Sequence, residues 1–347
     1  MPIDDLKETG RRRRHLLSRG CVHALVLAAL LSPRCFAQQP APDNAANPLA
    51  RMPEARAARQ NPQDEDQSSP TFRVNVKLVN VFATVVDANG APVGGLTKQD
   101  FTVLEDGKQQ KIAVFSRESG LPLSIALEVD TSLSTRKDLR LELESARRFA
   151  HTILRPVDAL SLFEFSEIVD ELVPFTSSLK RIDNGIDRIH GGAATALYDA
   201  IYLGARAVGR RQGRKVMVVI TDGGDTVSTT DYSQALRAAQ ESEAIVYSII
   251  VVPIAADAGR DIGGEHALIQ LSRDTGGKYF YASGSNQLDE AFRKISDELR
   301  TQYLLAYYPS ERVSDSDFRR IQVLVKGPAG KDLSVRARTG YYTSKAE

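Results

Sequence analysis

Three short segments carry hydroxyl and carboxylate side chains of the kind that bind a hard metal ion. They are Asp130-Thr131-Ser132-Leu133-Ser134, Gly191-Gly192-Ala193-Ala194-Thr195 and Thr221-Asp222-Gly223-Gly224-Asp225. Oxygen ligands of this type suit Mg²⁺, Mn²⁺ or Ca²⁺ rather than metals that prefer thiolate or imidazole. Taken singly, each segment is equally well explained as a helix cap or a turn, because Ser, Thr, Asp and Gly are common in both.

The positions of these segments relative to the predicted strands favour a shared site. The first follows an apolar run at 123–129 and the third follows another at 216–220, each typical of a strand covered on both faces. Open parallel sheets bind ligands outside the carboxyl ends of their strands. We therefore predict one divalent-metal site, whose ligands are Asp130, Ser132, Ser134, Thr195 and Asp222. Because few of these ligands are anionic, an acidic group of a partner can complete the coordination of the ion.

Strand and helix patterns alternate between residues 119 and 300. Apolar runs predict strands at 123–129, 159–165, 216–220, 244–252 and 278–281, with a short partner strand at 169–173. Apolar residues at helical spacing predict helices at 139–154, 197–208, 232–242, 266–273 and 288–299. This alternation indicates an α/β fold, a Rossmann-like doubly wound and mainly parallel sheet.

Two strand-rich flanks, at 71–118 and 301–343, surround this unit. In the first, Glu105-Asp106-Gly107-Lys108 separates two apolar runs and predicts a hairpin. Each flank alone is too short to form a small β-sheet that is stable by itself. We therefore expect the two flanks to pair or pack into one small β domain, into which the α/β unit at 119–300 is inserted.

The first 37 residues have the features of an export signal. Arginines at 11–14 and 19 precede an apolar run at 24–31, and Cys35-Phe36-Ala37 places small residues before a cut. The run is too short to span a bilayer. We expect cleavage near Ala37, which would remove both cysteines and leave a periplasmic, cell-surface or secreted protein without a transmembrane segment. Residues 38–70, rich in Gln, Pro, Ala and Asn, predict a disordered linker.

The charge balance argues against nucleic-acid or membrane-surface binding through bulk positive charge. The chain has 45 basic and 44 acidic residues and a net charge of +1. Cleavage at Ala37 would take away seven basic and three acidic residues and leave a net charge of −3. A basic cluster at 206–215 raises the question of a polyanion site. A solvated helix end is the favoured interpretation, because cations suit a helix carboxyl terminus.

No catalytic motif is recognised, so we expect a protein that is not an enzyme. The segment Ser283-Gly284-Ser285 is not the nucleophile elbow of a hydrolase, and no phosphate-binding loop is present in the sequence. Histidines beyond residue 37 are isolated: His151, His190 and His266. A phosphatase with Asp130 as nucleophile would want a second acid at position 132, which is a serine.

The three polar segments resemble the metal-ion-dependent adhesion site of von Willebrand factor type A domains. The resemblance covers roughly residues 120–300 and fills all five liganding positions. The flanks, with Gly94-Gly95-Leu96-Thr97 and Tyr303-Leu304-Leu305-Ala306-Tyr307-Tyr308-Pro309, resemble exported proteins of this type that are common in acidobacteria. The resemblance implies a metal-binding recognition domain, and it implies that the helix at 288–299 could shift with ligand occupancy.

The sequence therefore predicts an exported adhesion or protein-binding module. It would hold one divalent cation, Mg²⁺ or alternatively Mn²⁺ or Ca²⁺, and bind a carboxylate of a protein partner through it. Two alternatives stay open: an envelope scaffold in which the metal only rigidifies loops, and a metal-dependent hydrolase. No nucleic-acid partner is expected.

Overall fold

The structure is a computed structural model. It describes residues 78–117, 120–133, 135, 139–252, 261–310, 318–327 and 332–343. The predicted signal at 1–37, the predicted linker at 38–70 and the beginning of the first flank lie outside these residues. Within the described ranges, no helix is both long and apolar enough to cross a membrane.

A six-stranded sheet forms the centre of the α/β unit. Its strands run in the order β10 (Tyr279–Ala282), β9 (Ile245–Val251), β8 (Arg214–Thr221), β5 (Leu123–Asp130), β6 (Ala159–Phe165) and β7 (Val169–Thr176). Adjacent strands are parallel except for β7, which pairs with β6 in the antiparallel sense. All eight residues of β5 and all seven of β9 are buried, as a strand covered on both faces requires.

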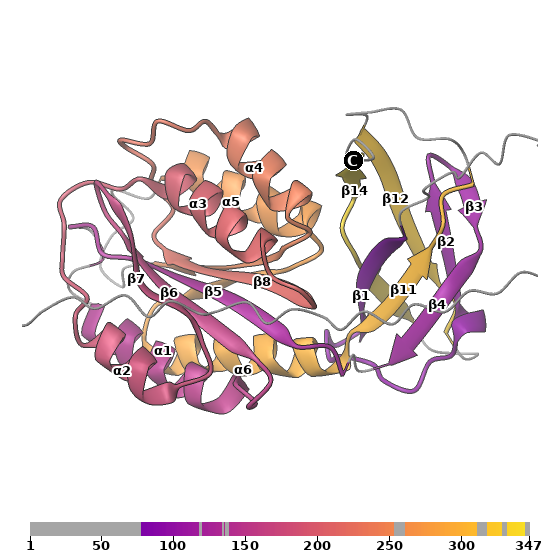
Figure 1. Cartoon of the computed structure of the whole chain (residues 1–347), viewed down its shortest axis with the longest axis horizontal. Coiled ribbons are helices and arrows are strands. Elements are labelled where there is room, and N and C mark those ends of the chain that lie inside the picture. The colour runs from indigo at the N-terminus through magenta and orange to yellow at the C-terminus, as the bar shows by residue number, and fades with distance from the viewer. Residues whose placement is uncertain are drawn as a thin grey trace, which may run out of the picture. The chain divides into compact units, whose positions relative to one another are not determined.

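Helices cover both faces of this sheet (Figure 1). One face carries α1 (Leu139–Ile153), α2 (Leu179–Ile186) and α6 (Ser285–Thr301), which contribute to one apolar cluster with alternate residues of the strands. The other face carries α3 (Leu197–Gly209), α4 (Tyr232–Glu241) and α5 (Ile262–Asp274), which contribute to a second cluster. The chain thus has the doubly wound, mainly parallel α/β fold that the sequence predicts.

Two further antiparallel sheets come from the flanks. The first has the order β13 (Leu333–Arg336), β1 (Val79–Asp87), β11 (Tyr303–Tyr307) and β4 (Ile112–Arg117). The second has the order β14 (Gly340–Tyr342), β12 (Phe318–Val325), β2 (Phe101–Glu105) and β3 (Lys108–Gln110). In both sheets strands from before and after the α/β unit are neighbours, so the flanks pair as expected and share a third apolar cluster. The exact division of the chain into segments stays a prediction.

The flanks join the α/β unit at several fixed points. Helix α6 ends at Thr301 and β11 begins at Tyr303, with a single residue between them. Arg336 of β13 forms an ion pair of 2.7 Å with the buried carboxylate of Glu298 in α6, and Lys278 lies 3.7 Å from the same oxygen. The Thr339 backbone N–H donates to the Asp274 carbonyl at 2.9 Å. These contacts hold the carboxyl ends of α5 and α6 against the flanking segments.

The predicted elements differ from the structure in a few places. Helix α2 was not expected, although Ser178 caps it and its apolar residues Leu179, Ile182 and Ile186 follow helical spacing. The short partner strand predicted at 169–173 extends to Thr176 as the edge strand β7, which pairs along β6 with irregular register. The strand pattern predicted before residue 78 lies outside the described residues.

Candidate metal centre

Asp130 is the last residue of β5, and its carboxylate is buried and held in one orientation. Its Oδ1 accepts a hydrogen bond from the Ser132 backbone N–H at 2.9 Å, and its Oδ2 accepts one from the Thr221 hydroxyl at 2.6 Å. The Ser132 hydroxyl also bonds to this carboxylate. Since Thr221 ends β8, these bonds tie the carboxyl ends of the two central strands together.

The surroundings of Asp130 at this edge of the sheet disfavour the negatively charged form of its carboxyl group. Burial raises the pKa of Asp130 to about 6. The bonds from Thr221 and Ser132 act in the opposite direction, and the nearby charge of Asp222 raises the pKa further. None of the described arginines or lysines forms an ion pair with Asp130 or Asp222. The site thus gathers acidic groups and leaves their counter-charge to be supplied by something else.

Thr195 lies in the loop before α3 and is held on both sides by backbone bonds. Its N–H donates to the Thr226 hydroxyl at 2.9 Å, and its carbonyl accepts from the Thr226 N–H at 2.8 Å. The same loop reaches the first segment, because the Gly192 N–H donates to the Thr131 carbonyl at 2.7 Å. The side chain of Thr195 is 5% exposed. The loop before α3 and the loop after β5 therefore share one edge of the sheet.

Asp222 sits on a turn whose shape depends on glycines. Gly223 has a φ of +97°, a conformation that favours glycine, and its N–H donates to the Thr221 hydroxyl at 3.1 Å. The turn packs against the start of α5: a Cβ placed on Gly264 would lie 1.4 Å from the Gly223 carbonyl oxygen. Asp222 is therefore positioned both by its own strand and by a helix that follows it in sequence.

The structure thus places four of the five predicted ligands at the same edge of the sheet. Asp130, Ser132, Thr195 and Asp222 follow or precede the elements that the sequence assigned to them. The fifth, Ser134, lies outside the described residues, so its position in the site stays a prediction. Among the described residues, no three His, Cys, Asp or Glu side chains are grouped so that they could hold a metal. The predicted site differs from such a group because it has two carboxylates and relies on hydroxyls for its other ligands.

Three supporting residues were not among the predicted site residues. Thr221 orients Asp130, and Gly264 makes room for the Asp222 turn.

Glu167, an exposed residue after β6, is the third. It accepts hydrogen bonds from the N–H groups of Ala193 and Ala194 at 2.9 and 3.4 Å. These bonds, the Ala193 bond foremost, lower the pKa of Glu167 to about 2. Its position after a parallel strand was the signal that would have found it.

The donor set fits a hard divalent cation. Carboxylate and hydroxyl oxygens are the ligands that Mg²⁺ and Ca²⁺ take, and no described thiol or imidazole belongs to the set. The carboxylate of Asp130 is already oriented and desolvated, which is the costly part of building such a site. A bound ion would act here as a Lewis acid that attracts an anionic oxygen from outside the chain.

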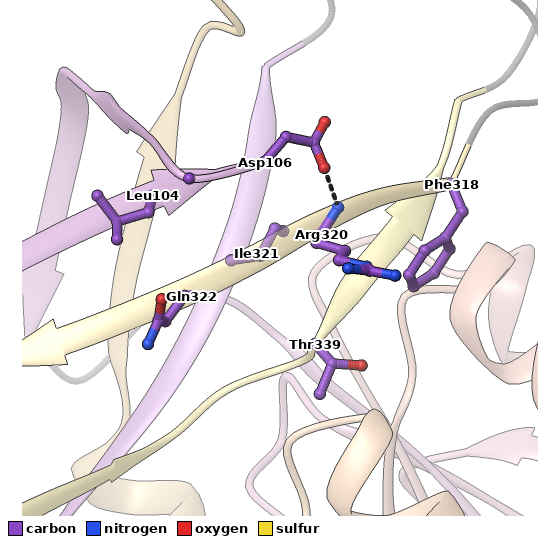
Figure 2. Close-up of a pocket in the computed structure, with 8 residues that line it drawn as sticks. Leu104, Asp106, Phe318, Arg320, Ile321, Gln322 and Thr339 are labelled. Carbon is purple, nitrogen blue, oxygen red and sulfur yellow. Dashed lines mark hydrogen bonds between the residues drawn. The ribbon is translucent and has the colours of Figure 1, made fainter.

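A hollow of the molecule lies elsewhere, on the flanking sheets (Figure 2). It has a volume of about 710 Å³ and lies between the turn at 106–107 and strand β12. The carboxylate of Asp106 in this hollow already has partners. Its Oδ1 accepts from the Arg320 N–H at 3.0 Å, the bond dashed in Figure 2. Its Oδ2 forms an ion pair with Arg319 at 3.0 Å. The polar groups in this hollow stabilise a hairpin, so its size alone does not make it the functional site.

Comparisons with known proteins bear on the α/β unit. Residues 125–224 match the von Willebrand factor type A domain family. No curated protein matched the chain. The matched range contains Asp130, Ser132, Thr195 and Asp222.

Similar solved structures cover the same unit at low identity. The conserved hypothetical protein BatB from Bacteroides thetaiotaomicron is 21% identical over 52% of this chain and 100% of that one, with a TM-score of 0.42. A von Willebrand factor type A protein from Catenulispora acidiphila is 11% identical over 79% and 76%, with a TM-score of 0.45. The vWF domain of the pilus tip protein Mfa5 from Porphyromonas gingivalis is 13% identical over 51% and 94%, with a TM-score of 0.42. Identities at this level carry no information on function. The family match and the sheet topology agree that the chain contains a von Willebrand factor type A domain.

Proposed function

We propose that this chain is an exported recognition protein that binds an acidic group of a protein partner through one divalent cation. Asp130, Ser132, Ser134, Thr195 and Asp222 would hold the ion, with Mg²⁺ as the first choice and Mn²⁺ or Ca²⁺ as alternatives. The observation that carries the proposal is the buried, oriented carboxylate of Asp130 beside Asp222, with no described cation to balance them. Neutral hydroxyls leave the ion under-neutralised, which favours an anionic ligand from outside.

Calorimetric titration of the purified chain with Mg²⁺ and Mn²⁺ tests the metal site. Wild type is expected to bind one ion per chain, and Asp130→Ala and Asp222→Ala are expected to weaken binding at least a hundredfold. Asp289→Asn is a matched control, because Asp289 lies on the surface of α6 and its carboxylate forms an ion pair of 2.9 Å with Arg148 of α1. Equal binding by wild type and both site variants would refute the site.

The scaffold alternative makes a different prediction about partners. If the ion only stiffens loops, a partner captured from the source organism is expected to bind equally well after the metal is removed, provided that low temperature keeps the loops in place. If the ion bridges the two proteins, capture requires Mg²⁺ and fails in EDTA. A free carboxylate such as acetate then competes at high concentration. Capture that ignores EDTA would favour the scaffold.

The hydrolase alternative has no observation in its favour among the described residues. Position 132 is a serine bonded to Asp130, so Asp130 lacks the neighbouring acid that a phosphoryl-transfer nucleophile would use. We therefore propose that the protein is not an enzyme. Turnover of a phosphate or carboxylate ester that disappears in Asp130→Ala would overturn this.

Export is the remaining part of the proposal. The signal-like segment at 1–37 supports it, as does the resemblance of the flanking motifs to exported proteins. Mass spectrometry of the chain recovered from the source cells is expected to find a new amino terminus just after Ala37. An intact amino terminus in the cytoplasmic fraction would contradict export.

A further inference from the structure

The basic cluster at 206–215 is divided by the fold into groups with different roles. Arg214 is buried and donates to the Leu299 carbonyl, so it fixes α6 at the base of the sheet. Arg211 lies over the Phe175 ring at 5.1 Å and donates to the Ser124 hydroxyl at 3.2 Å. Arg206 in the last turn of α3 and Arg210 at its C-cap remain exposed, and neither forms an ion pair with any described residue.

These two arginines meet a third across a groove between α3 and α4. The groove has a volume of about 610 Å³, and Arg237 of α4 lines its opposite side. Small residues, among them Ala205 and Ala238, line it together with the three arginines, while Thr229 and Thr230 lie beside them. Two helices that are far apart in sequence therefore bring three guanidinium groups to one hollow.

The charge in this groove is only partly compensated. Arg237 donates to Glu241 at 2.8 Å and lies over the Tyr342 ring at 4.6 Å. Arg206 lies over the Tyr202 ring at 5.8 Å, a contact that leaves its positive charge unbalanced. Arg206 and Arg210, four residues apart at the carboxyl end of α3, place two like charges on one side of the groove. A carboxylate between them would relieve their repulsion and form paired hydrogen bonds to planar guanidinium groups.

We propose that this α3–α4 groove binds an acidic peptide segment of a partner protein, through Arg206, Arg210 and Arg237. A densely charged polyanion fits less well, because Glu241 is itself part of the groove lining. The chain as a whole is nearly charge-balanced, with 45 basic and 44 acidic residues, so it lacks a field that would hold a nucleic acid or sulfated polymer. A peptide with a few spaced carboxylates can pair with the arginines and avoid Glu241.

The groove is separate from the metal centre. Thr195 and Asp222 lie where α3 begins and where β8 ends, whereas Arg206 and Arg210 lie at the carboxyl-terminal end of α3. A 13-residue helix is about 20 Å long. Binding in the groove therefore requires no metal ion, and this proposal stands or falls independently of the proposed function.

Fluorescence anisotropy in EDTA tests the groove without interference from the metal site. The probe is a fluorescein-labelled octapeptide that carries two glutamates among glycines and serines. Wild type and Asp130→Ala are expected to bind it with equal affinity. The double variant Arg206→Gln/Arg210→Gln is expected to bind at least tenfold more weakly, and the affinity of wild type is expected to fall as salt is added.

Controls separate recognition from general charge. The double variant Arg140→Gln/Arg293→Gln removes two exposed arginines that pair with acids on their own helices, at 3.0 and 2.8 Å, and is expected to bind like wild type. Thermal unfolding of each variant checks its folding. The proposal is overturned if wild type does not bind the peptide, or if it binds equally well to a peptide in which both glutamates are replaced by glutamine. It is also overturned if both double variants of the protein lose the same affinity. It is also overturned if a sulfated hexasaccharide or an oligonucleotide binds more tightly than the peptide.

Discussion

The two ends of the six-stranded sheet use buried carboxylates in opposite ways. At the end where the flanks join, Asp158 accepts four hydrogen bonds, one from the Leu123 N–H and three from Arg155, and Glu298 pairs with Arg336. At the carboxyl ends of the strands, Asp130 accepts only neutral donors and has Asp222 beside it. Arginines pair with the carboxylates of Asp158 and Glu298, whereas no described cation pairs with Asp130, where we propose that a metal ion binds.

The largest effect is expected at the joining end, from Glu298→Ala. The substitution leaves Arg336 and Lys278 without their shared, 2%-exposed carboxylate, which should lower the free energy of unfolding by about 3 kcal/mol. Mg²⁺ should not change this loss. Chemical denaturation measures it, with Glu290→Ala on the exposed side of the same helix as the control, expected within about 0.5 kcal/mol of wild type. Equal losses in the two variants would remove the distinction between the two ends.

At the end of the sheet where the metal site is proposed, Gly264→Ala should lower the free energy of unfolding by about 2 kcal/mol and weaken Mg²⁺ binding at least tenfold. The new Cβ would overlap the Gly223 carbonyl oxygen and displace the Asp222 turn. Gly263→Ala is the neighbouring control, because its Cβ would meet only Asp261 Oδ1, at 3.2 Å. Denaturation with and without Mg²⁺, together with calorimetry, measures both effects. Normal Mg²⁺ affinity in Gly264→Ala would show that α5 does not position the turn.

Asp158→Asn should lower the free energy of unfolding by about 1.5 kcal/mol at neutral pH. Burial acts to raise the pKa of Asp158, but the hydrogen bonds from Arg155 and Leu123 outweigh it and lower the pKa below 3.8. The stabilisation is therefore fully present above the unfolded pKa of about 3.9 and is lost as the pH falls through the folded value. The gap between variant and wild type should be constant above about pH 5 and shrink below about pH 4. A gap that does not depend on pH would contradict this account.

The smallest effect should come from Thr221→Val, about 1 kcal/mol, because the side-chain shape is kept while the hydroxyl loses its hydrogen bond to Asp130 and the one that it accepts from the Gly223 N–H. Mg²⁺ affinity should fall as well, since the carboxylate is less firmly oriented. Thr221→Ser keeps the hydroxyl and should restore both properties. If serine does not rescue them, the methyl group rather than the hydrogen bond is what matters at this position.

The sequence was sufficient for the parts of the fold that rest on local periodicity. The buried runs at 123–129 and 216–220 became β5 and β8, and the polar residues after them lie at one edge. Helix α2 was overlooked because it is only eight residues long and follows an exposed edge strand. The role of Gly264 was not predictable, because its constraint is the Gly223 carbonyl, brought there by tertiary packing. The groove arginines likewise belong to helices whose pairing no local pattern reveals.

The single-residue connection between α6 and β11 has a mechanical consequence. Gln302 is buried and its amide donates to the Thr84 hydroxyl at 3.2 Å, while β11 lies inside its sheet between β1 and β4. A pull along the direction of β11 would load its pairing with β1 in shear, so the five residue pairs from Val79–Tyr307 to Ala83–Tyr303 would resist together rather than one after another. A load applied at the carboxyl ends of the strands, where the metal site is proposed, would thus reach the flanks through a connection of one residue that can extend very little.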